Sequence, residues 1–199
     1  TEPEMMWLKR GEDGKPDGGV TKPYCYHIDQ FESLRPVFMQ VIEYAQAMGL
    51  DMIQGDHEDA PGQLELNWQF DDVVRNADRL STYRQICAQV ARENNLIACF
   101  MSKPFMGVSA SGCHTNVSLW KGGESRVNRL HNDTLPGMDD VFTYRVGGEN
   151  SFMPDTDDIQ KPGKIGLQCV GGIVKHLSAL TAIGCSTVNS YRRLWDTGF

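Results

Sequence analysis

Apolar residues recur every three to four positions in three long segments of the chain. Over residues 31–48 and 71–95 this spacing predicts two amphipathic helices, the first ending at Gly49 and the second packing as core. Residues 165–183 predict a third helix. Its Gly171-Gly172 pair costs about 1 kcal/mol per glycine relative to alanine, which indicates a close backbone contact at that point.

Strict alternation of apolar and polar residues predicts strands between these helices. Over residues 63–69 three apolar side chains face one way and Glu65 lies on the opposite, polar face, which is typical of a half-buried strand. Pro61-Gly62 is a turn signal, so residues 50–56 are expected to pair with this strand as a hairpin. Glu58 and Glu65 would then converge at one rim of the sheet.

Further strands are expected at residues 1–9, 96–101 and 113–120. Residues 10–23 form a polar loop rich in Gly and Pro. Residues 121–163 lack hydrophobic periodicity and are expected to form a polar surface excursion or lid.

Composition narrows the possible partners. The chain has 199 residues, 40% of them hydrophobic, and a formal net charge of −7. Because no basic run offsets this charge, we expect no nucleic-acid partner, and because no apolar run reaches the length of a bilayer span, we expect no membrane partner. A cytoplasmic location follows as an expectation. Six scattered cysteines are interpreted as small buried hydrophobes in preference to disulfide or zinc partners (Cys25, Cys87, Cys99, Cys113, Cys169 and Cys185).

Three strand-like segments offer oxygen or imidazole ligands at alternate positions. They carry Glu2 with Glu4, Glu58 with Glu65, and His114. Several carboxylates with one imidazole and no thiolate favour a hard cation such as Mg²⁺ or Mn²⁺. Two alternatives stay open from these residues alone: a solvated acidic hairpin, and a structural core role for His114.

Several motifs, taken together, resemble those of glutamine synthetases. Residues 57–65 (HEDAPGQLE) resemble the signature H-E-x-A-x-G-Q-x-E, and Glu2-Pro3-Glu4 resembles the E-P-E strand of that family. The remaining matches, in the family's order, are K-P-F at 103–105 with S-G-C-H at 111–114 and Ser118, G-G-I-V-K-H at 171–176, and N-S-Y-R-R-L at 189–194.

The resemblance implies an α+β catalytic domain in which an antiparallel sheet forms a metal-lined funnel backed by helices. Residues 1–199 would be part of that domain, with an N-terminal domain and the C-terminal part of the catalytic domain lying outside them. The implied reaction is glutamine biosynthesis in nitrogen metabolism: ATP phosphorylates the γ-carboxylate of glutamate, and ammonia displaces phosphate from γ-glutamyl phosphate. The implied assembly is a homo-oligomer of stacked rings with active sites between subunits.

Roles for individual residues also come from the resemblance. It makes Glu4, Glu58 and Glu65 ligands of one divalent ion, and Glu2 and His114 ligands of a second. Glu58, with Tyr24, would receive the amine, and Arg193 would meet the transferring phosphate. The nucleotide would lie near Ser118, Asn116 and Lys103, and glutamate near Ser109, Ala110 and Gly112.

Departures from the family pattern leave alternatives. Ser109-Ala110 replaces a common Asn-Gly, and Asn116 replaces a common His. These changes admit methylamine or another small amine as acceptor in place of ammonia. A non-catalytic relative is a further possibility, although all five implied metal ligands are present. We expect the isolated 199-residue chain to be inactive and its full-length parent to be an enzyme.

Overall fold

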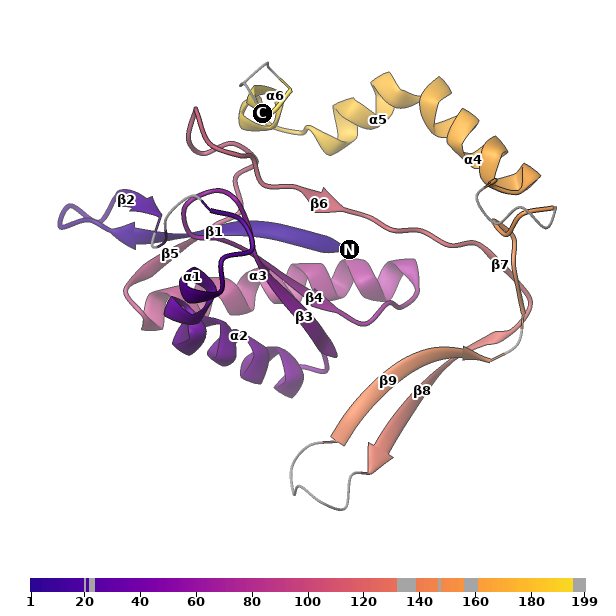
Figure 1. Cartoon of the computed structure of the whole chain (residues 1–199), viewed down its shortest axis with the longest axis horizontal. Coiled ribbons are helices and arrows are strands. Elements are labelled where there is room, and N and C mark those ends of the chain that lie inside the picture. The colour runs from indigo at the N-terminus through magenta and orange to yellow at the C-terminus, as the bar shows by residue number, and fades with distance from the viewer. Residues whose placement is uncertain (20, 22–23, 132–138, 147, 156–160, 195–199) are drawn as a thin grey trace.

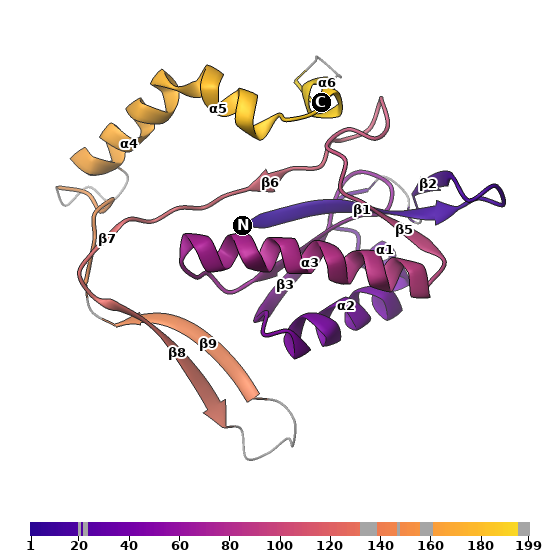
Figure 2. The same ribbon diagram turned by 180° about the vertical axis from the view of Figure 1, so that it is seen from behind.

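A twisted antiparallel sheet packed against two helices forms the main body of the molecule (Figures 1 and 2). The computed structural model describes residues 1–19, 21, 24–131, 139–146, 148–155 and 161–194. Strand β1 (Glu2–Arg10) is the hub of the sheet because it pairs antiparallel with four other strands. These are β2 (Pro16–Gly19), β4 (Gln63–Trp68), β5 (Leu96–Cys99) and β6 (Cys113–His114), and β3 (Met52–His57) in turn pairs with β4.

The predicted hairpin is confirmed. Strands β3 and β4 pair antiparallel, and Gly62 takes a φ of 75° in the turn between them, a conformation that glycine adopts readily. However, all six residues of β4 are buried, so the strand is not half-buried as predicted. Its apolar side chains enter the core, while its polar side chains Gln63, Glu65 and Asn67 form hydrogen bonds within the site described below.

Helices α2 (Arg35–Ala47) and α3 (Val73–Glu93) pack together against one face of the sheet (Figure 2). Trp7 and Tyr83 are fully buried in the core between these layers. The predicted helix at 31–48 is divided, because the short helix α1 (Ile28–Ser33) ends before Leu34 and α2 begins directly after it. Pro36 lies in the first turn of α2, where its missing N–H costs nothing but where it cannot continue a preceding helix.

The N-terminus of α3 has a side-chain cap. The Asp72 carboxylate accepts hydrogen bonds from the backbone N–H groups of Val74 and Arg75, at 3.1 and 3.0 Å. Asp72→Ala is therefore expected to lower the free energy of unfolding by about 1 kcal/mol. Urea unfolding followed by tryptophan fluorescence would measure this change. Asp78→Ala, in an exposed position further along the same helix, is the control and should change stability by much less.

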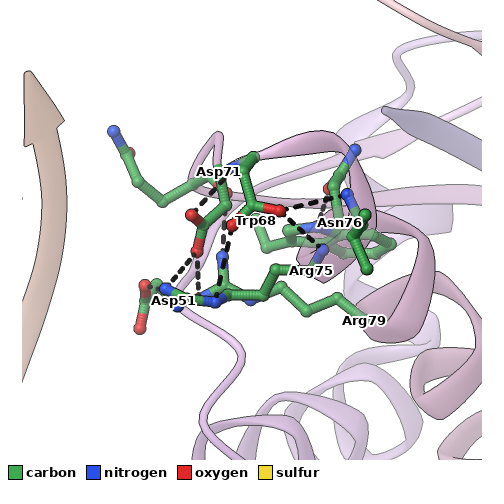
Figure 3. A network of polar contacts seen from close by, with 9 residues as sticks. Asp51, Trp68, Asp71, Arg75, Asn76 and Arg79 are labelled. Atoms are coloured by element: carbon green, nitrogen blue, oxygen red, sulfur yellow. Dashed lines mark hydrogen bonds and ion pairs between the residues drawn. The ribbon is translucent and has the colours of Figure 1, made fainter. Parts of the chain in front are cut away.

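A buried charge network closes the end of the core where β3 begins, β4 ends and α3 starts (Figure 3). The Arg79 guanidinium lies 3.3 Å from an Asp71 carboxylate oxygen and 3.4 Å from one of Asp51. It also donates to the backbone carbonyl of Gln69 at 3.2 Å. Nearby, the Trp68 indole N–H donates to the Asn76 side chain at 2.7 Å. One arginine of α3 thus joins the connection before β3 to the connection after β4.

Beyond β6 the chain leaves the main body as an extended arm (Figure 1). It forms β7 (Trp120–Lys121) with β10 (Glu149–Asn150), and a long hairpin of β8 (Glu124–His131) with β9 (Asp139–Val146). The polar region predicted at 121–163 therefore contains strands. The strand predicted at 113–120 is wrong in its middle, since 115–119 form no strand. Both predictions depended on side-chain periodicity, whereas a strand is defined by backbone hydrogen bonds to a neighbouring strand, which periodicity does not reveal.

The C-terminal segment confirms the helix predicted at 165–183 except for a break at His176. It consists of α4 (Lys164–Lys175), α5 (Leu177–Gly184) and α6 (Val188–Arg192), with a 70° bend between the first two. An added Cβ at Gly171 or Gly172 would meet no atom within 4 Å, so the predicted close backbone contact is wrong. No single described helix is long and apolar enough to span a membrane, although α4 and α5 together meet the length and composition criteria.

The prediction that the cysteines are buried is confirmed at two positions. Cys87 and Cys99 are buried, whereas Cys25, Cys113 and Cys169 are exposed. Burial raises the pKa of the Cys87 thiol to about 12, so this group is inert at neutral pH. The prediction is wrong for the three exposed thiols, because apolar neighbours in sequence do not guarantee that tertiary packing covers them.

Candidate metal and substrate site

Strand register gathers the predicted acids in neighbouring strands. Glu4 of β1 stands opposite Glu65 of β4, and Glu65 stands opposite Asp56 of β3. At the start of β1, Glu2 stands opposite His114 of β6. Residues directly opposite in an antiparallel pair have adjacent side chains, so a row of carboxylates and one imidazole crosses four strands.

His114 lies between the two acids of β1. Its Nδ1 is 3.6 Å from a Glu2 oxygen, and its Nε2 is 4.0 Å from a Glu4 oxygen. Its side chain is 60% exposed, which contradicts the alternative of a buried core histidine. Asn116 donates to the other oxygen of Glu2 at 2.7 Å, so the structure places Asn116 beside a predicted ligand. Glu2 and His114, the two residues predicted to share one ion, are therefore neighbours, and Glu4 of the other predicted set borders the same imidazole.

The pKa of Glu58 depends on its burial and on the charges of the neighbouring acids. Burial, followed by the negative charges of Glu4 and Glu65, raises the pKa of Glu58 to about 7. Burial also raises the pKa of Glu65, although a hydrogen bond from Asn67 at 2.8 Å acts in the opposite direction. Half-buried carboxylates that repel one another are the setting in which a cation is bound most favourably.

A loop over residues 102–112 borders this cluster and carries the predicted glutamate contacts. The Gly112 backbone N–H donates to Glu4 at 2.8 Å, and the Arg193 guanidinium donates to the Ser111 carbonyl at 3.1 Å. Arg193 directly follows α6, so the loop joins the acid cluster to the C-terminal helix. Ser109 hydrogen-bonds through its hydroxyl to Asp59, next to Glu58.

Lys103 stabilises this loop from within. Its side chain is buried and its ammonium donates to the Val108 carbonyl. Its backbone N–H donates to the Asn189 side chain, whose own amide donates back to the Lys103 carbonyl, both at 2.7 Å. A nucleotide contact by Lys103 stays a prediction. In the structure, Lys103 links the 102–112 loop to Asn189 of α6.

Two further predicted residues lie apart from these contacts. Tyr24 is on the surface beside His27, with ring centroids 6.2 Å apart, and Ser118 accepts a hydrogen bond from Trp120 at 2.9 Å. The sequence prediction omits Tyr26, although the negative charge of Glu58 is the main cause that raises the pKa of this tyrosine. Asp56 is also omitted, although its alternation with Glu58 is visible in the sequence.

Comparison with known proteins decides the family. The chain matches the sequence profile described as glutamine synthetase, catalytic domain, over residues 2–153 and 142–199. The chain belongs to this family. Among relatives, a glutamine synthetase of Rhizobium leguminosarum bv. phaseoli is 34% identical over 170 residues, which are 85% of this chain and 34% of that protein. A glutamate–methylamine ligase of Methyloversatilis universalis is 31% identical over 202 residues, covering 97% of this chain and 39% of that protein.

Solved structures of the glutamine synthetase family agree on the fold. The structure titled apo GmaS without ligand superposes with a TM-score of 0.71 and 30% identity, covering 97% of this chain and 40% of that one. This confirms the predicted α+β, glutamine synthetase-like catalytic fold. The chain spans between a third and two fifths of the length of these relatives.

The donor chemistry of this glutamine synthetase-family site fits a hard divalent cation, since oxygen donors dominate and one imidazole joins them. Its arrangement stops short of a formed metal centre. Within the described ranges, no three His, Cys, Asp or Glu side chains are grouped so as to hold an ion. Cation binding would therefore require these side chains to move closer together.

Gly112 keeps the junction between loop, acids and Arg193 open. An added Cβ would lie 3.0 Å from His114 Nε2, 3.1 Å from Glu4 Oε1 and 3.3 Å from Arg193 Nη2. Gly112→Ala is therefore expected to push these three groups apart and, in the full-length protein, to slow the ADP release proposed below at least about tenfold, with little change in thermal stability.

Steady-state assays and thermal melts of the full-length protein would test this expectation. Gly171→Ala is the matched control, because an added Cβ at that position meets open space, and its turnover should equal that of wild type. Unchanged turnover in Gly112→Ala would contradict the role assigned to this glycine.

Proposed function

We propose that the full-length protein containing this chain is an ATP-dependent ligase that joins ammonia to the γ-carboxylate of glutamate through γ-glutamyl phosphate. The observation that carries the proposal is the convergence of Glu2, Glu4, Glu65 and His114 by strand register, with Glu58 beside them. Family membership supports the reaction class, because relatives bear the names glutamine synthetase and glutamate–methylamine ligase.

Mg²⁺ or Mn²⁺ is the cofactor that the donor set would take. Glu4, Glu58 and Glu65 would hold one ion, and Glu2 with His114 would contribute to a second. Bound cations would supply positive charge for phosphoryl transfer, which an acidic chain of net charge −7 otherwise lacks. Burial, and after it the negative charges of neighbouring acids, raises the pKa of Glu58 and of Glu65, and a bound cation would offset this cost of ionisation.

The chain's own residues would then perform three tasks. Gly112 and its loop would border glutamate, and Arg193 would place its guanidinium where negative charge develops on the transferring phosphate. Glu58 would accept a proton from the incoming amine. Asn116 and Ser118, on the extended segment after β6, would border the nucleotide.

Methylamine is the second candidate acceptor. The similarity to a glutamate–methylamine ligase favours it. A non-catalytic role is disfavoured by the presence of all five proposed ligands.

The decisive experiment follows ADP release by the full-length protein with ATP, Mg²⁺ and glutamate, and with ammonium or methylamine supplied in parallel. Faster turnover with ammonium supports the first proposal, and faster turnover with methylamine supports the second. Absence of glutamate-dependent ADP release with either amine would contradict both and favour a non-catalytic relative.

A further inference from the structure

Gln63 is a buried polar residue at the junction of the turn, strand β1 and the 102–112 loop. Its side chain is almost completely buried, with 1% exposed, and both polar atoms of its amide have partners. Its Oε1 accepts from the Ala60 backbone N–H at 2.9 Å. Its Nε2 faces three acceptors: Glu4 Oε2 at 3.0 Å, the Ala110 carbonyl at 3.1 Å and the Ser111 hydroxyl at 3.2 Å.

The orientation of this amide is fixed by its surroundings. If the oxygen and nitrogen were exchanged, Oε1 would face the Glu4 carboxylate and the Ala110 carbonyl, and Nε2 would face the Ala60 N–H. Both sets of contacts would then be repulsive. The amide must therefore direct its N–H groups toward Glu4 and the loop.

Glu4 receives these donors at one oxygen. Its Oε2 accepts from the Gln63 Nε2–H at 3.0 Å and from the Gly112 backbone N–H at 2.8 Å. Its Oε1 is the oxygen nearer His114, at 4.0 Å from Nε2. Two N–H donors on one oxygen fix the plane of the carboxylate and turn the other oxygen toward the acid cluster.

We propose that Gln63 is a positioning residue that orients the Glu4 carboxylate toward a bound cation and locks the 102–112 loop to the same carboxylate. The inference rests on the proposed cation site, and it assigns Gln63 no contact with cation or substrate. Through this amide, the position of the loop that borders glutamate is coupled to the orientation of Glu4. Groups that orient a metal-binding carboxylate typically change metal affinity by about 10–100-fold when removed.

The test is Gln63→Met in the full-length protein, because methionine has a similar length and no N–H to donate. Mn²⁺ affinity, measured by electron paramagnetic resonance of the free ion, is expected to fall at least about tenfold. Gln63→Asn, which keeps an amide but is one methylene too short to reach Glu4, should give the same loss. It serves as the working variant if Gln63→Met does not fold.

Two controls separate positioning from general destabilisation. Ser111→Ala removes one acceptor of the Gln63 amide and leaves its bond to Glu4, so Mn²⁺ affinity should stay close to that of wild type. Val41→Ala lowers core stability on helix α2, away from this junction, and should also leave Mn²⁺ affinity unchanged.

A double variant tests whether Gln63 acts through Glu4. If it does, adding Gln63→Met to Glu4→Gln should lower Mn²⁺ affinity no further than Glu4→Gln alone. Unchanged affinity in Gln63→Met, or fully additive losses in the double variant, would overturn the inference while the cation site stands. Failure of the wild-type protein to bind Mn²⁺ would instead overturn the cation site, and this inference with it.

Discussion

Replacing Arg79 with leucine is expected to lower the free energy of unfolding by about 3–5 kcal/mol, a large share of the stability of a domain of this size. Only 10% of the Arg79 side chain is exposed, and its partners Asp51 and Asp71 are 10% and 1% exposed. Leucine would occupy the space but would leave Asp51 buried without this cation, whereas Asp71 would keep its contact with Arg75. The loss therefore comes mainly from the stranded Asp51 carboxylate and less from the missing contacts (Figure 3).

Arg75→Leu is the matched control. Arg75 lies one helical turn earlier on α3 and also contacts Asp71, at 3.1 Å, but 53% of its side chain is exposed. Water already screens this pair, and Asp71 would keep Arg79, so the expected cost is below about 1 kcal/mol. Urea unfolding of both variants would measure the difference. Equal losses in the two variants would contradict the role assigned to burial.

The loss of stability in Arg79→Leu should also depend on pH and become smaller as the pH falls. Burial raises the pKa of Asp51 above its ordinary value of 3.8, and Arg79 opposes that rise. Without Arg79 the folded-state pKa rises further, so the folded variant binds a proton more readily than the unfolded chain. Its stability relative to wild type should therefore improve as the pH falls from about 7 toward about 4. A deficit that grows on acidification would contradict this assignment.

The helices and strands of the main body are largely predictable because their side-chain pattern follows their burial. The spacing of apolar residues over 71–95 corresponds to α3, and the alternation over 63–69 corresponds to β4. Apolar periodicity misses the division between α1 and α2, since apolar residues continue through the break at Leu34, although Pro36 is a break signal in the sequence. The bend between α4 and α5 at His176 is likewise missed. Apolar periodicity indicates which face of a helix is buried, but not whether the helix is continuous.

The site is predictable as a set of residues and only partly as an arrangement. Glu2, Glu4, Glu65 and His114 can be named from motifs, and their register confirms that they are neighbours. Gln63 appears within a motif without a role, because its function depends on contacts with residues more than 40 positions away. Such contacts are decided by tertiary packing, which local pattern does not contain.

Glu58→Gln is expected to lower the turnover of the full-length protein by about 10²–10⁴-fold, the range typical for removal of a general base. Glutamine keeps the shape of the side chain but cannot accept a proton from the amine or contribute a charge to a cation. The backbone around position 58 should be unaffected, because the Glu58 N–H donates to the Gln63 carbonyl at 3.0 Å whatever the side chain.

Stability should respond in the opposite direction, which separates this effect from misfolding. Burial and the charges of Glu4 and Glu65 disfavour the ionised form of Glu58 in the folded state. Glutamine removes that repulsion, so without divalent cation the melting temperature should stay equal to wild type or rise. ADP release and thermal melts would be measured together, with Glu43→Gln on the exposed face of α2 as control. Turnover close to that of wild type would exclude Glu58 as the base, whereas lost turnover with a lowered melting temperature would indicate a structural role.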